Sequence, residues 1–246
     1  MKNYVLSVAL TVIGCLYSSA QVPANYNADN ESFGMQPMLQ YAFQQLNSKT
    51  IRGLEETDII GSRYLSEEFK KTAIYSGDGN LEGYAFSRYD GYNDEIQLKK
   101  NLSDDDISVL LRRADIYCMV GNTAIVFKKY YDKSGKLQRG HLFKLRETDN
   151  LILYERKIKN FKEGKRAANS LQMNVKSRFV GDSELYFMKK GDDKIQYLKT
   201  TKKGVIGLFK EDTDKVAAIK QHISDKNIKI KESDDIVRII NYYETL

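Results

Sequence analysis

The pattern of apolar and polar positions predicts a strand-rich stretch over most of the chain. From about Tyr64, short runs rich in Tyr, Ile, Val and Phe alternate with clusters of Gly, Asp and Asn, which is typical of β-strands joined by turns. Residues 77–80, Gly-Asp-Gly-Asn, predict a hairpin turn. The predicted strands cover residues 72–76, 81–87, 93–99, 115–120, 123–131, 137–146, 151–161, 173–179, 184–189 and 194–199.

The C-terminal end changes to apolar spacings of three and four residues, which predicts helices. Thr213 and Ser233 stand where N-caps are expected, and Asn227 stands where a helix would stop. Strands followed by helices favour an α+β fold. We expect mainly antiparallel sheet, or a partly open barrel or sandwich, with a short N-terminal helix and two to three C-terminal helices. The predicted C-terminal helices cover residues 205–209, 215–224 and 234–243.

The first twenty residues have the three parts of a cleavable signal peptide. Lys2 precedes an apolar run over residues 4–17, and small residues lead to a predicted cleavage site between Ala20 and Gln21. The run is shorter than the roughly twenty residues that a bilayer-spanning helix needs. Two alternatives to a cleaved signal peptide stay open: the run could form a buried N-terminal helix, or Cys15 could become a lipidated N-terminus. We expect an exported protein of the periplasm, the cell surface or the medium, without a transmembrane segment once the signal is removed.

Four regions follow from these patterns. Residues 1–20 are the signal peptide and residues 21–56 a polar leader with a short helix, predicted from apolar residues spaced helically between 38 and 46. Residues 57–200 form the β-rich domain, and residues 201–246 a helical segment packed on it. Within the β-rich domain, Ser103 and Asp106 have capping-box spacing, which predicts a short helical or turn segment.

Charge is divided unevenly along the chain. Residues 21–127 hold 10 Lys and Arg against 16 Asp and Glu, whereas residues 128–246 hold 28 against 17. A net charge of +11 on the second part is compatible with a polyanion such as nucleic acid, lipopolysaccharide or acidic polysaccharide. The basic residues are interleaved with acids, which favours solvated faces of strands and helices instead. We expect no specific contact with nucleic acid.

Groups suited to catalysis or metal binding are scarce. The chain has two cysteines and two histidines, and Cys118 would be alone after removal of the signal. Cys118 lies in the apolar run Ile-Tyr-Cys-Met-Val, so we expect a buried, inert thiol and no pairing with His141. No CxxC or HExxH spacing is present, and we expect neither a metal site nor a cofactor.

Acidic and aromatic residues gather in two places. Tyr89, Tyr92, Asn93 and Asp94 form a candidate ligand surface on the predicted sheet. Carboxylates between Asp94 and Asp106 could serve a hydrolase or bind calcium, because both need acidic oxygens close together. Adjacent residues of a strand point to opposite faces, which argues against one shared site. Turn and cap chemistry is the simpler interpretation.

Several segments resemble a group of uncharacterised exported proteins of Bacteroidota. The resemblance rests on residues 61–69 (GSRYLSEEF), 88–89 (RY), 92–95 (YNDE) and the tail 217–246, which contains IINYY. It implies export and the same fold class. It implies no activity and transfers no catalytic residue to this chain.

The leading functional hypothesis is therefore a non-catalytic secreted or envelope-associated module that binds a protein or glycan partner. One alternative is an exported hydrolase that uses carboxylates near Asp94 to Asp106. The other is polyanion binding through the basic C-terminal part. Two carboxylates converging in a pocket would favour the hydrolase, and cations gathered on one face would favour polyanion binding.

Overall fold

The computed structural model describes residues 43–45, 59–167, 169 and 173–246. These residues form a large, mostly antiparallel sheet and short C-terminal helices, which confirms the predicted α+β class. The predicted signal peptide, its cleavage site at Ala20 and Gln21, and nearly all of the leader lie outside the described residues. Within the described part of the chain, no helix combines the length and apolar character needed to cross a membrane.

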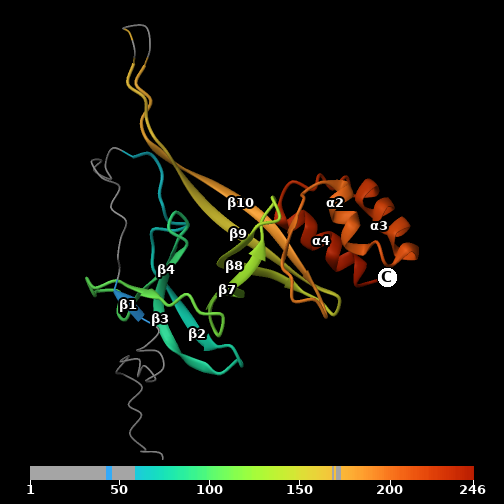
Figure 1. Cartoon of the computed structure of the whole chain (residues 1–246), viewed down its shortest axis with the longest axis horizontal. Coiled ribbons are helices and arrows are strands. Elements are labelled where there is room, and N and C mark those ends of the chain that lie inside the picture. The colour runs from blue at the N-terminus through green and yellow to red at the C-terminus, as the bar shows by residue number, and fades with distance from the viewer. Residues whose placement is uncertain (1–42, 46–58, 168, 170–172) are drawn as a thin grey trace, which may run out of the picture. The chain divides into compact units, whose positions relative to one another are not determined.

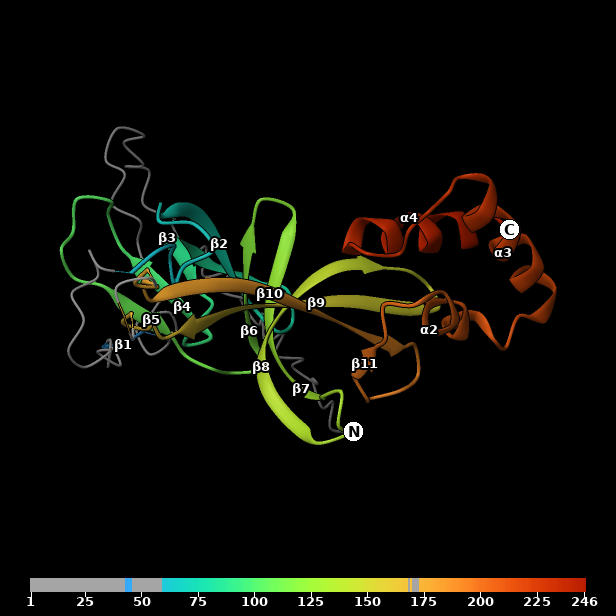
Figure 2. The ribbon, with the colours of Figure 1, turned by 90° about the horizontal axis from the view of Figure 1, so that it is seen from above.

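Eleven strands form one sheet in the order β1-β5-β4-β3-β2-β6-β7-β11-β10-β9-β8. Figure 1 shows the sheet, and Figure 2 shows it from above. The strands are β1 (Phe43–Gln45), β2 (Lys70–Ser76), β3 (Leu81–Asp90), β4 (Glu95–Lys99), β5 (Ser108–Leu110), β6 (Ile116–Val120), β7 (Thr123–Tyr131), β8 (Leu137–Glu147), β9 (Leu151–Lys162), β10 (Arg178–Lys189) and β11 (Gln196–Leu198).

The last five strands pair in a closed cycle. β7 pairs with β8, β8 with β9, β9 with β10 and β10 with β11, all antiparallel. The cycle closes through one parallel pairing, in which Gln196 of β11 lies opposite Tyr131 of β7. All five strands contribute to one apolar cluster: Val126, Tyr130, Leu142, Ile152, Tyr154, Tyr186, Met188 and Tyr197, with Ile195 just before β11.

A second apolar cluster belongs to the earlier strands. It is built from β2 to β6 and is completed by Ile125 of β7 and Phe143 of β8. The β7–β8 hairpin therefore presents one face to each cluster, because alternate residues of a strand point to opposite faces. Phe143 faces the second cluster, and its neighbour Leu142 faces the cluster of the closed cycle.

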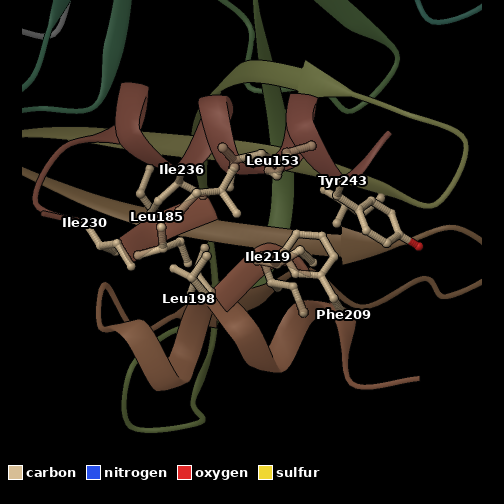
Figure 3. Close-up of a cluster of buried hydrophobic side chains, with 14 residues drawn as sticks. Leu153, Leu185, Leu198, Phe209, Ile219, Ile230, Ile236 and Tyr243 are labelled. Carbon is tan, nitrogen blue, oxygen red and sulfur yellow. The ribbon is translucent and has the colours of Figure 1, made fainter. Parts of the chain in front are cut away.

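Four short helical elements cover the other face of β9, β10 and β11. Leu153 of β9, Leu185 of β10 and Leu198 of β11 pack with Ile219 and Ile236 of the helices in a third cluster, which Figure 3 shows. The alternate residues of β9 and β10 face the closed cycle instead, so both faces of these strands are buried where the helices lie. The elements are α2 (Lys202–Ile206), the 3₁₀ helix η2 (Gly207–Phe209), α3 (Thr213–Asp225) and α4 (Ser233–Tyr243).

Two local predictions differ from the structure, and one that named two alternatives is decided by it. Residues Phe43–Gln45 form β1, paired with β5, where the leader helix was predicted. Helical spacing of a few apolar residues is a weak signal, and the free edge of β5 offers these residues backbone partners. The remainder of that predicted helix lies outside the described residues. The segment at Ser103, predicted as helical or turn, is a turn at residues 102–103 that leads through an irregular stretch to β5. Neither Thr213 nor Ser233 is an N-cap, since each is the first residue inside its helix.

The predicted burial of Cys118 is confirmed, and it leads to a test. Its thiol is fully buried in the second cluster, and burial raises its pKa to about 12. Because the thiolate is the reactive form, we expect a thiol reagent at neutral pH to label the native protein very slowly and the urea-unfolded protein promptly. Prompt labelling of native protein would contradict this assignment.

Candidate functional site

A pocket of about 590 Å³ opens where the closed cycle of strands meets the segment between β5 and β6. Its walls carry four cationic side chains and one carboxylate, that of Asp193. Its apolar lining comes from Phe127, from Ala114 and from four residues of the apolar cluster of the closed cycle. The cations are Arg112, Lys128, Lys129 and Arg139, and the other apolar residues are Ala114, Ile152, Tyr154, Met188 and Ile195.

Strand pairing brings two of the cations together. Lys129 of β7 lies directly opposite Arg139 of β8, and Lys128 lies opposite Gly140. Like charges at directly opposed positions of an antiparallel pair destabilise it by a few tenths of a kcal/mol up to about 1 kcal/mol. A bound anion would remove this repulsion, so the pairing favours an anionic occupant.

Three of the four cations are not neutralised by an acid of the described residues. Among the residues that the structure describes, Lys128, Lys129 and Arg139 form no ion pair. Arg112 pairs with Glu95, with Nη2 and Oε1 separated by 3.3 Å. Three cations of the pocket are thus available to a ligand, and the fourth is held in place by the chain.

The apolar lining adds a neutral hydrogen-bonding group. Burial, with a smaller contribution from the charge of Glu147, raises the pKa of Tyr154 to about 12. Its phenol keeps its proton at neutral pH, as it would at the usual tyrosine pKa of about 10, and a protonated phenol can donate a hydrogen bond. A pocket with cationic walls, an apolar lining and a phenol donor suits a ligand that has both an anionic group and a carbon skeleton.

The predicted ligand surface lies at the end of β3, which holds Tyr89, and in the turn that joins β3 to β4. Tyr89 is only 5% exposed, and its hydroxyl donates to the carboxylate of Asp94. That carboxylate also accepts the backbone N–H of His141 in β8, at 3.2 Å to each oxygen. Asp94 has a φ of 57°, a conformation that Asp tolerates better than most residues. Tyr89 and Asp94 therefore join the turn to β8 and do not form an exposed surface.

The same turn is closed by a buried ion pair. Asp90 is fully buried, and its Oδ2 lies 2.6 Å from Nη2 of Arg63. Its Oδ1 accepts the backbone N–H groups of Tyr92 and Asn93, both at 3.0 Å. Of the four predicted residues, Tyr92 is the most exposed, and its ring packs edge-on against Phe179.

Arg112 connects the turn to the pocket. Its Nη2 donates to the backbone oxygens of Asn93, at 2.9 Å, and Asp94, at 3.3 Å. The turn thus holds one cation at the pocket wall, and Asp94 holds β8 at the residue next to Gly140. The residues that the sequence predicts as a ligand surface therefore help to position the pocket. The four cations that line it are not among the residues predicted from the sequence.

One sequence feature could have indicated these cations. Lys128 and Lys129 interrupt an apolar, aromatic strand between Phe127 and Tyr130. Adjacent cations in such a strand place one charge on each face, including the face that packs inward. Arg112 and Arg139 give no comparable signal, because Arg112 reaches the pocket from a loop.

The carboxylates of the hydrolase hypothesis serve mainly local structure. Asp94 is occupied as described above, and Asp104 accepts the backbone N–H of Asn101 at 2.8 Å. Burial raises the pKa of Glu95, although Arg112 opposes this effect. None of these three residues lines the pocket. Within the described residues, no group of three or more His, Cys, Asp or Glu side chains is placed to hold a metal ion.

Comparison with protein-family models, curated proteins and solved structures finds no significant match to this chain.

Proposed function

We propose that the protein is a non-catalytic binding module whose pocket holds an anionic group of its partner, an acidic saccharide being the chemistry that fits best. The observation that carries this proposal is the like-charge pair of Lys129 and Arg139 at the pocket wall. Both side chains are exposed and solvated, and they form no ion pair with a residue that the structure describes, so a ligand that brings negative charge would relieve their mutual repulsion.

The remainder of the lining favours a saccharide over a bare inorganic anion. Phe127 and Tyr154 supply aromatic surface, and Ile152 and Met188 supply aliphatic surface. A sugar ring presents C–H groups to such a surface while its carboxylate meets the cations. The N-terminal export pattern agrees with this proposal, because acidic glycans belong to the envelope and the medium.

The test replaces Arg139 by glutamine and measures binding by calorimetry. The probe is a linear tetrasaccharide of galacturonic acid, and maltotetraose is the neutral comparison. A charge-assisted hydrogen bond contributes about 1.5–3 kcal/mol, so we expect Arg139→Gln to weaken binding of the acidic probe about tenfold to a hundredfold. We expect maltotetraose to bind neither protein.

Lys136→Gln is the matched control, because Lys136 is exposed in the turn of the same β7–β8 hairpin and lies outside the pocket. It should bind the acidic probe as the original protein does. Without ligand, Arg139→Gln should unfold at a slightly higher urea concentration, because the repulsion with Lys129 is gone. Equal affinity for both saccharides, or equal loss in both variants, would overturn the proposal.

A further inference from the structure

Beyond the sheet, β9 and β10 continue as a narrow hairpin (Figure 1). Lys165 and Val175 exchange two backbone hydrogen bonds of 2.8 Å, and the N–H of Gly164 donates to Oγ of Ser177 at 2.9 Å. We call residues 162–167 and 173–178 the basic arm. It shares no residue with the pocket.

The basic arm concentrates positive charge. Residues 162–178 of the sequence contain five cations and one acid, Glu163. All five cations are exposed, and none forms an ion pair with another residue that the structure describes. Cations therefore outnumber acids by five to one along the arm. The cations are Lys162, Lys165, Arg166, Lys176 and Arg178.

The arm also exposes apolar side chains among these charges. Met173 is 89% exposed and Val175 is 47% exposed. Met173 is the most exposed of the large apolar residues in the described part of the chain. Aromatic residues are found only at the base, where Phe161 and Phe179 pack together with ring centroids 5.4 Å apart.

We propose that the basic arm docks on the surface of an anionic phospholipid bilayer. Cations near such a surface are attracted to its headgroups, and apolar side chains among them enter the boundary between headgroups and acyl chains. Single-stranded nucleic acid is the other polyanion to consider, but it is held by stacking on aromatic side chains. The described outer part of the arm has none, and it offers methionine and valine instead.

The test measures partition of the purified protein onto vesicles by flotation. One vesicle contains equal parts of phosphatidylcholine and phosphatidylglycerol, and the other contains phosphatidylcholine alone. We expect binding to the anionic vesicle only. Each cation near the surface contributes about fivefold to partition, so the double change Lys165→Gln with Arg166→Gln should lower it about thirtyfold. Met173→Ser keeps the charge and should lower it about fivefold, through lost apolar contact.

The matched control is Lys220→Gln with Lys229→Gln, which removes the same charge from exposed positions at the helical end. It should retain nearly all binding. Equal loss in both double variants would show unspecific attraction of a basic protein and would overturn the proposal. Equal binding to both vesicles, or binding to neither, would also overturn the proposal. A third contrary result would be an arm variant that still binds vesicles but no longer binds duplex or single-stranded DNA. Urea unfolding of each variant confirms that the fold is intact.

Discussion

Replacing Asp90 by alanine should lower the free energy of unfolding by about 3–5 kcal/mol, which is the usual cost of removing one partner of a buried ion pair. Asp90 is fully buried, and the side chain of Arg63 is only 10% exposed. Alanine at position 90 would remove the carboxylate that faces the Arg63 guanidinium in this buried site. The backbone N–H groups of Tyr92 and Asn93 would lose their acceptor as well. Urea unfolding monitored by circular dichroism measures the change.

Two comparison variants separate the parts of this effect. Asp90→Asn keeps an oxygen that can accept the N–H groups of the turn but removes the negative charge, so we expect a loss between those of the alanine variant and the original protein. Asp78→Ala alters a carboxylate in an exposed hairpin turn and should cost less than about 1 kcal/mol. A loss below about 1 kcal/mol for Asp90→Ala would show that the Arg63–Asp90 pair does not hold the turn.

The Asp90 variant also tests how the turn and the pocket are connected. Arg112 is positioned by the backbone oxygens of Asn93 and Asp94, and Asp90 fixes the path of the chain just before them. Where enough native protein remains, Asp90→Ala should bind the acidic saccharide more weakly, although Asp90 does not line the pocket.

Replacing Leu153 by alanine should cost about 2.7–5 kcal/mol, the range for buried leucines that leave a cavity behind. Leu153 is fully buried where β9 meets the helices, in the cluster shown in Figure 3. The surrounding residues come from three strands and from the helical elements, so they cannot collapse into the space without shifting a layer. Urea unfolding measures the loss, and hydrogen exchange should show earlier opening of α4.

Leu137→Ala provides the control for this variant. Leu137 also lies in a strand of the closed cycle, β8, but it is 50% exposed. Removing the same atoms there should change the free energy of unfolding by no more than about 0.5 kcal/mol. Similar losses at both positions would mean that the strand–helix cluster does not stabilise the fold.

Several features follow from the sequence alone because they depend on neighbouring residues. Alternating apolar positions and the Gly-Asp-Gly-Asn turn predict β2 and β3, and the structure places the turn between Ser76 and Leu81. Helical spacing predicts α3 and α4 within a few residues of their observed limits. The apolar neighbours of Cys118 predict its burial. Each of these depends on the period of one element, which is visible in a short window.

Tertiary structure alone decided where those elements meet. The pocket needs Arg112 from a loop, Lys129 and Arg139 from one hairpin, and Met188 from a strand about fifty residues later. The closed cycle depends on a single parallel pairing between β7 and β11. Tyr89 and Asp94 resemble an exposed ligand surface in the sequence, yet they are turned inward because β8 passes over them and supplies the N–H of His141. The period of a strand determines which residues share a face, but packing between distant segments determines whether that face is covered.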